Sequence, residues 1–286
     1  MAKTILQSEL RPLEKKLNAM AYTRDISRVF DDWLRYMIQG FSPDAVPISD
    51  WGYKLEDDKK FHDMYEEWVL LMDKQIQKKS QEKGDYGWYD AFGSLYEGCI
   101  ASKGRKDNNS QFFTPETICD FMARIQGDPE TEVIQGRTIS DPTCGSGRTL
   151  LAFNALFPGN YLVAEDIDKT CCMMTVCNFL IHGCVGEVVW HDSLNPNSFY
   201  GAWKVNEGLN NPFSEWFGIP HIRQVEYEET CTFYAMQKHI GAKETPAIVE
   251  TKPAVVVESK PITEPTQAPK VIKKIVNQQA IQLTLF

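Results

Sequence analysis

The chain has 286 residues, of which 43% are hydrophobic, and it carries a formal net charge of −9. This length is enough to bury one substantial core together with a smaller satellite domain. The acidic balance disfavours non-specific binding to duplex DNA, because affinity for duplex DNA comes largely from neutralised phosphates. Any DNA contact must therefore be local or supplied by a partner.

The eight cysteines lie in apolar or helical contexts, and no signal peptide or membrane-length apolar run is present. We therefore expect a cytoplasmic protein with reduced thiols. A metal site is an alternative interpretation of Cys171, Cys177, His182 and Cys184. These residues lack a paired Cys-x-x-Cys knuckle and fall on one helical pattern, so the sequence favours no metal.

Residues 1–85 are predicted to form an all-helical N-terminal region. Apolar residues recur at helical spacing in two stripes, separated by a loop over residues 40–53 that contains proline and glycine. The first stripe consists of Ile26, Val29, Phe30, Trp33 and Met37, and the second of Phe61, Met64, Tyr65, Trp68, Leu71, Met72 and Ile76. We expect these helices to pack against each other and against the next domain, over residues 86–241.

That domain begins with an aromatic-rich stretch and a polar, basic loop over residues 103–110. Thr114 then suits the N-cap of a helix and Pro115 its first position. The helix that follows is predicted to bury the apolar side chains Ile118, Phe121, Met122 and Ile125.

Residues 137–168 show a strand, a glycine-rich turn, a helix and a second strand. The first strand, residues 138–140, leads into Asp141-Pro142-Thr143-Cys144-Gly145-Ser146-Gly147, and the second, residues 161–164, ends at Glu165, Asp166 and Asp168. Glycine permits a tight turn and the close approach of a ligand to the backbone. An acid at the tip of the next strand can accept hydrogen bonds from both hydroxyls of a ribose. The pattern therefore predicts a site for a nucleoside-containing cofactor.

Two other nucleotide sites fit this turn less well. A phosphate-binding loop would need Gly-x-x-x-x-Gly-Lys-[Ser/Thr], and Arg148 follows the last glycine instead. A dinucleotide fingerprint would need a third glycine, which is absent.

A second helix and a third strand follow the acids. Met173, Val176, Cys177, Leu180 and Ile181 form one apolar side of a helix that Gly183 would end. The third strand, residues 187–190, is followed by His191-Asp192-Ser193-Leu194.

Taken in order, these segments resemble the S-adenosylmethionine (SAM) site of N6-adenine-specific DNA methyltransferases, and most closely that of the modification subunits of type I restriction-modification systems. The resemblance implies an α/β fold with a Rossmann-like SAM-dependent methyltransferase sheet. It also implies a cofactor site in which Phe113, Thr114 and Pro115 cover the methionine end and Asp192 accepts from the adenine amine, beside Ser193. The full set of implied cofactor-binding residues is Phe113, Thr114, Pro115, Asp141, Pro142, Cys144, Gly145, Gly147, Asp166, Asp168, Asp192 and Ser193.

In this family the target base is held by Asn/Asp-Pro-Pro-Tyr/Phe at the tip of strand four. Two oxygen acceptors hold the adenine amine while it becomes pyramidal, and the aromatic ring stacks on the flipped base. The nearest match is Asn210-Asn211-Pro212-Phe213, which implies Asn210 as acceptor, Pro212 as the rigid turn residue and Phe213 as stacker. Asn206, after a predicted strand over residues 202–205, and Asn195-Pro196 are alternatives, and so is an ordinary loop.

The remaining chain is too short for a complete sheet of about seven strands, so we expect an incomplete one. Residues 242–276 are rich in Pro, Val, Thr, Lys and Glu and predict a disordered tether. Residues 277–286 end in Gln282, Leu283, Thr284, Leu285 and Phe286, which resemble the pentapeptide that docks bacterial proteins on the DNA sliding clamp. A frayed tail is the alternative.

The sequence therefore predicts a SAM-dependent, site-specific adenine DNA methyltransferase of bacterial or phage origin. Its expected partners are DNA, the sliding clamp through Gln282, Leu283, Leu285 and Phe286, and a separate specificity subunit. A catalytically weak or inactive accessory protein on the clamp is the main alternative. A methyltransferase for RNA or protein is a third, which the type I-like helical lead-in disfavours.

Overall fold

The computed structural model describes residues 6–43, 46–81, 87–100, 113–195 and 197–244. All of these residues belong to one compact unit. The predicted docking residues Gln282, Leu283, Leu285 and Phe286, and all but the first three residues of the predicted tether, lie outside the described residues. None of the helices in the described ranges is long and apolar enough to span a bilayer.

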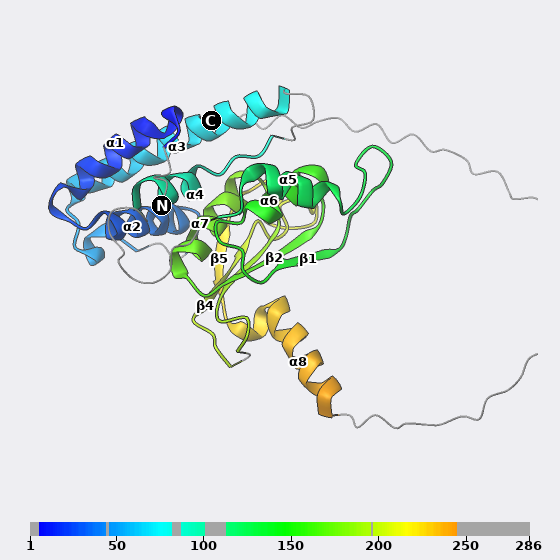
Figure 1. Cartoon of the computed structure of the whole chain (residues 1–286). Helices are drawn as coiled ribbons and strands as arrows, with labels where there is room; N and C mark the ends of the chain where they lie inside the picture. The colour runs from blue at the N-terminus through cyan, green and yellow to red at the C-terminus, as the bar shows by residue number, and fades with distance from the viewer. Residues whose placement is uncertain (1–5, 44–45, 82–86, 101–112, 196, 245–286) are drawn as a thin grey trace, which may run out of the picture. The chain divides into compact units, whose positions relative to one another are not determined.

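The N-terminal part is helical, as predicted (Figure 1). It contains α1 (Arg11–Met20), α2 (Ile26–Gly40) and α3 (Leu55–Gln81), with the short 3-10 turns η1 (Ser8–Leu10), η2 (Ala21–Thr23) and η3 (Ile48–Trp51). The Asp25 carboxylate caps α2 by accepting from the Arg28 amide at 3.1 Å. Both predicted apolar stripes face the interior, and only Ile26, Tyr65 and Ile76 are partly buried at the edges.

The short helix α4 (Ala91–Leu95) connects these helices to the rest of the core. The ring of Phe92 lies 5.2 Å from that of Trp33 in α2 and 5.0 Å from that of Trp68 in α3. All three side chains are buried. A π-helical turn, η4 (Tyr96–Ile100), follows α4. The helical region and the start of the next domain therefore share one aromatic core.

The sheet has five strands among the described residues, in the order β1 (Thr138–Asp141), β2 (Tyr161–Asp166), β3 (Gly186–Trp190), β4 (Gly201–Val205) and β5 (Ile222–Val225). The first three strands are parallel, whereas β4 is antiparallel to β3 and β5 is antiparallel to β4. The parallel strands are joined by α6 (Arg148–Leu156) and α7 (Lys169–Ile181). This arrangement confirms the predicted α/β fold with a Rossmann-like sheet.

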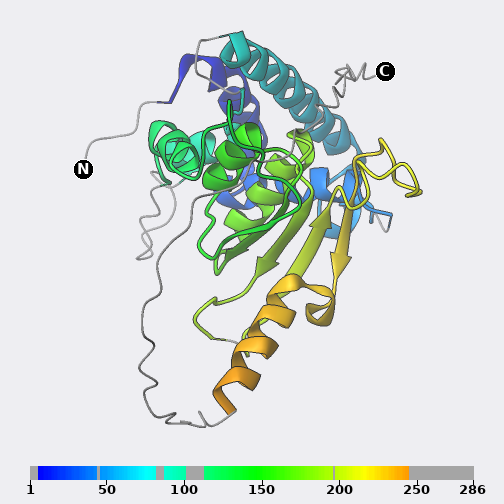
Figure 2. The ribbon, with the colours of Figure 1, turned by 90° about the vertical axis from the view of Figure 1, so that its right-hand side faces the viewer.

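Helices cover the two faces of the sheet unequally. In Figures 1 and 2, α5 (Glu116–Arg124), α6 and α7 lie on one side of the strands, and α8 (Cys231–Glu244) lies on the other. Two buried carboxylates hold α8 in place. Glu187 of β3 accepts from the Thr232 amide at 3.3 Å, and Glu165 of β2 accepts from the Thr232 hydroxyl at 2.7 Å. The 3-10 turn η5 (Tyr227–Glu229) precedes this helix.

The predictions for α5 were wrong in two respects. The helix begins at Glu116 with Pro115 as its N-cap, so Thr114 does not cap it and Pro115 is not its first residue. The apolar side chains Ile118, Phe121, Met122 and Ile125 are 40–63% exposed. The buried residues are instead Cys119 and Ala123, whose small side chains let α5 approach α6 closely.

Candidate cofactor site

The glycine-rich turn after β1 forms the floor of the site. Gly145 and Gly147 adopt φ values of +57° and +87°, which side chains disfavour. A Cβ atom at Gly145 would lie 2.8 Å from the Phe113 ring, and one at Gly147 would lie 3.0 Å from Thr175. The Gly145 amide donates to the Asp166 carboxylate at 2.9 Å. The turn after β1 and the acid at the end of β2 are therefore joined directly.

A cavity of about 430 Å³ opens over this turn. The predicted cofactor residues that line it are Phe113, Thr114, Asp141, Pro142, Cys144, Gly145 and Asp166. Met122 of α5 also lines it, which explains part of the exposed apolar surface of that helix.

The other predicted cofactor residues lie beside the cavity. Pro115 and Gly147 are the N-caps of α5 and α6. Asp168 caps α7 by accepting from the amides of Thr170 and Cys171 at 2.7 and 3.2 Å. The loop that carries Asp192 and Ser193 begins next to Asp166, because the His191 amide donates to the Asp166 carbonyl at 3.0 Å. All of these residues therefore lie near the carboxyl ends of β1, β2 and β3.

The described residues that line the cavity carry more negative than positive charge, since Asp141 and Asp166 face one arginine. Burial raises the pKa values of both the Asp141 and the Asp166 carboxyls, and hydrogen bonds from the Thr143, Gly145 and Asp168 amides partly offset this. Among the described residues that line the cavity, Arg148 is the one cation, and it forms ion pairs with Asp90 and Glu97 behind the turn. Such a cavity suits a ligand that has hydroxyl groups and a positive charge.

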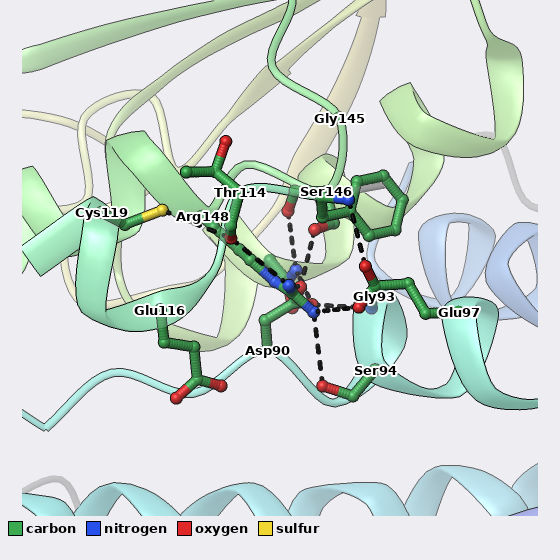
Figure 3. Close-up of polar contacts among 12 residues, drawn as sticks. Asp90, Gly93, Ser94, Glu97, Thr114, Glu116, Cys119, Gly145, Ser146 and Arg148 are labelled. Atoms are coloured by element: carbon green, nitrogen blue, oxygen red, sulfur yellow. Dashed lines mark hydrogen bonds and ion pairs between the residues drawn. The ribbon is translucent and has the colours of Figure 1, made fainter. Parts of the chain in front are cut away.

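A buried polar network supports the turn from behind (Figure 3). The Asp90 carboxylate accepts from the Ser146 hydroxyl at 2.6 Å, from Arg148 Nε at 2.7 Å and from Asn178 Nδ2 at 2.9 Å. Burial favours the neutral form of Arg148, but the carboxylates of Asp90 and Glu97 outweigh burial and raise its pKa. Asn178 also donates to the Ser146 carbonyl at 2.9 Å. The network thus fixes both the side chain and the backbone of Ser146.

The cysteines of the site are not poised as nucleophiles. Cys144 and Cys171 are buried, and burial raises the pKa of each thiol well above its usual range. Within the described ranges no cluster of three or more His, Cys, Asp or Glu side chains is arranged to hold a metal.

The structure contradicts the expected position of the catalytic motif. Because β4 is antiparallel, its last residue, Val205, pairs with Gly186 at the start of β3. Asn206 then donates to the carbonyls of Phe179 and Cys184 at the far end of α7, 3.2 and 3.0 Å away. The 13 residues of α7 separate this end from Asp168 by about 20 Å.

Asn210, Pro212 and Phe213 belong to the same far turn, since the Leu209 amide donates to the Asn206 carbonyl. Phe213 is 96% exposed. The structure therefore does not bring these three residues to the cofactor cavity. Of the two alternative asparagines, Asn206 donates to backbone carbonyls at the far end of α7, and Asn195 lies in the loop that follows the carboxyl end of β3.

A parallel strand, a glycine turn, a helix and a second parallel strand that ends in a carboxylate define an α/β domain with a cavity at the carboxyl ends of these strands. The family model of N-6 DNA methylases matches residues 88–282, which is more than half of the chain. The chain therefore belongs to the N-6 DNA methylase family, as its motifs predicted.

Among solved structures, the chain is similar to the methyltransferase subunit of a type I restriction-modification system from Streptococcus thermophilus. The identity is 18% and the TM-score 0.30, over 64% of this chain and 38% of that subunit. The chain thus spans well under half the length of that subunit. No curated protein matches the chain.

Proposed function

We propose that this protein is a SAM-dependent methyltransferase that acts on the exocyclic amine of adenine in DNA. The family assignment supports the reaction class. The observation that carries the cofactor assignment is the cavity with two carboxylates, Asp141 and Asp166, over a turn whose positive φ values and close contacts favour glycine. SAM would supply an electrophilic methyl group on a sulfonium.

The residues around the cavity fit this cofactor. Each Asp166 oxygen already accepts one amide hydrogen, from Gly145 or from Asp168, and retains a second lone pair for a ribose hydroxyl. Asp141 faces the cavity from the neighbouring strand and adds negative charge for a sulfonium. Phe113 and Met122 provide apolar contact surface for the methionine end.

Cofactor binding is tested by titration calorimetry with SAM. Asp166→Asn keeps the size of the side chain but removes its charge, and we expect it to weaken SAM binding by at least about tenfold, or 1.4 kcal/mol. Asp73→Asn, on the exposed face of α3, is the matched control and should leave the affinity unchanged. Equal affinity in the wild type and Asp166→Asn would count against the assignment.

Methyl transfer requires a separate assay, because the position of Asn210 and Phe213 favours a second candidate function. If no other residue, such as Asn195, holds the adenine amine at the cavity, the protein would bind SAM but serve as an accessory protein that does not methylate. Transfer of labelled methyl from SAM to adenine-containing duplex DNA distinguishes the two functions. SAM binding without transfer to any duplex, also after addition of a specificity subunit, would establish the accessory function.

The clamp-docking function of Gln282, Leu283, Leu285 and Phe286 also remains a proposal. It is supported by their sequence: three apolar side chains could fill a pocket while the glutamine bonds at its rim. Deletion of residues 282–286 should abolish co-elution with a bacterial sliding clamp. Unchanged co-elution of the shortened chain would exclude docking through this tail.

A further inference from the structure

A second cavity, of about 410 Å³, lies between the end of α2 and strands β3 to β5. We call it the α2 groove. Aromatic side chains form much of its wall, namely Trp190 of β3, Tyr200 just before β4 and Trp203 of β4. The Trp190 and Tyr200 rings are 5.2 Å apart, and Tyr200 is 56% exposed. The groove therefore presents an accessible aromatic face.

The charge of the α2 groove is opposite to that of the chain. Arg35, Lys169 and Arg223 line it, and none of the described residues that line it carries a carboxylate. Arg223 is held by Glu207 and Glu229 at 3.1 and 2.8 Å. This local cationic surface contrasts with the net charge of −9.

The other two cations lie over aromatic rings and form no ion pair with a described residue. Arg35 lies 4.3 Å from the centre of the Trp51 ring, and Lys169 lies 5.1 Å from that of Trp190. Both side chains are exposed. Their charges are therefore available to an anionic ligand.

The α2 groove and the cofactor cavity lie on either side of the first turns of α7. Cys171 lines the cofactor cavity, whereas Lys169 and Met173 line the groove. Asp166, at the end of the preceding strand, faces the cofactor cavity. A polymer bound in the groove would therefore lie next to the cofactor.

We propose that the α2 groove binds an unpaired segment of DNA. Arg35 and Lys169 bind phosphates, and Tyr200 and Trp190 stack on a base. A cationic groove with exposed aromatic rings is the chemistry by which proteins hold single-stranded nucleic acid. The assignment deepens the proposed function, on which it rests for its choice of DNA as the ligand. It also explains how an acidic chain contacts DNA locally.

The test measures fluorescence anisotropy of a labelled single strand of about 12 nucleotides with the full chain. The double variant Arg35→Glu/Lys169→Glu should bind at least about tenfold more weakly, and its salt dependence should be shallower by roughly 1.4 in log–log slope, or 0.7 for each lost phosphate contact. Lys59→Glu/Lys74→Glu on α3 makes the same charge change at exposed positions and should change the affinity by less than about twofold.

A second pair of variants tests stacking. Tyr200→Ala should weaken binding by about tenfold with an unchanged salt slope, whereas Tyr200→Phe keeps the ring and should retain the affinity. Equal losses in the α3 control, no loss in the groove variants, or no binding of DNA by the wild type would overturn the assignment. Tighter binding of an RNA of the same sequence would also overturn the assignment. The same holds if free AMP competes with an affinity equal to that of the single-stranded DNA.

Titration with SAM separates this test from that of the proposed function. All groove variants should keep the SAM affinity of the wild type, because none of the altered residues lines the cofactor cavity. A chain that binds DNA through the groove but does not bind SAM would disprove the proposed function and leave the groove assignment intact.

Discussion

Replacement of Asp90 by alanine should strongly destabilise the protein. Asp90 is fully buried, and its carboxylate is 2.7 Å from Arg148 Nε, whose side chain is only 7% exposed. Removal of one partner of a buried ion pair costs about 3–5 kcal/mol, because the other charge is left uncompensated. Glu97, 3.1 Å from Arg148, keeps part of the compensation, so we expect the lower end, about 3 kcal/mol.

The assay is urea denaturation at neutral pH, followed by tryptophan fluorescence and by far-UV circular dichroism. A loss of about 3 kcal/mol is a large part of the 5–15 kcal/mol that stabilises a typical domain, so the midpoint should shift clearly. Glu56→Gln, which removes the exposed Lys54–Glu56 pair, is the control and should cost less than about 0.5 kcal/mol.

A double variant tests the physical reason. Because Asp90→Ala leaves Arg148 charged and buried, the additional change Arg148→Met should recover stability, with a coupling of about 0.5–3 kcal/mol. A loss below about 1 kcal/mol in Asp90→Ala, or a double variant as unstable as the sum of the single variants, would refute the reasoning.

Four further predictions concern the site and its pH dependence. Gly145→Ala should cost more stability than Gly136→Ala and should weaken SAM binding, because both glycines have positive φ but only Gly145 contacts Phe113; the strain alone costs about 1–3 kcal/mol, and thermal melts compare the two. Asn210→Ala should leave methyl transfer to DNA unchanged, since the residue lies at the far end of the sheet; a large loss of activity would show that this position is wrong. Burial raises the pKa of Asp166, so SAM affinity in calorimetry should fall on acidification at a higher pH than an ordinary aspartate would cause. Because the folded protein binds this proton more readily than the unfolded chain, the contribution of Asp166 to stability decreases as the pH rises from the unfolded to the folded pKa. Burial lowers the pKa of His182 in the folded protein, so the protein should lose stability as the pH falls from the unfolded pKa of about 6.5 to the lower folded pKa. His182→Gln should flatten this part of the curve of urea midpoint against pH.

The helical periodicity of apolar residues predicted the N-terminal helices correctly. In the structure the apolar stripes are buried, as this argument assumes. The same argument failed for α5, whose Phe121 and Ile125 are exposed. Periodicity shows that one face of a helix is apolar, but it does not show that anything covers this face. The small residues Cys119 and Ala123, which determine the packing of α5 on α6, carry little hydrophobic signal.

The position of the catalytic motif was predicted from order along the chain, which assumed that β4 runs parallel to β3. The connection between these strands spans only residues 191–200. A parallel crossover needs about a dozen or more residues, usually with a helix, so this length already favoured an antiparallel strand. The sequence therefore contained the signal that corrects the prediction.

The Asp90 network could not be predicted from the sequence. Ser146 and Arg148 belong to the recognised turn, but Asp90 lies 56 and 58 positions before them. Asn178 reaches the same carboxylate from α7, where its direct neighbours Cys177 and Phe179 are apolar. Such contacts depend on how α4, α6 and α7 pack, and the spacing of residues along the chain does not predict this packing.

The burial of the thiols offers a simple reporter of folding. Seven of the eight cysteines are buried, and Cys231 is the partly exposed one. Because accessible thiolates attack alkylating reagents, a folded chain should react mainly at Cys231, whereas each local opening of the core would expose further thiols. The number of labels per molecule, read by mass spectrometry, would then count how much of the interior has opened.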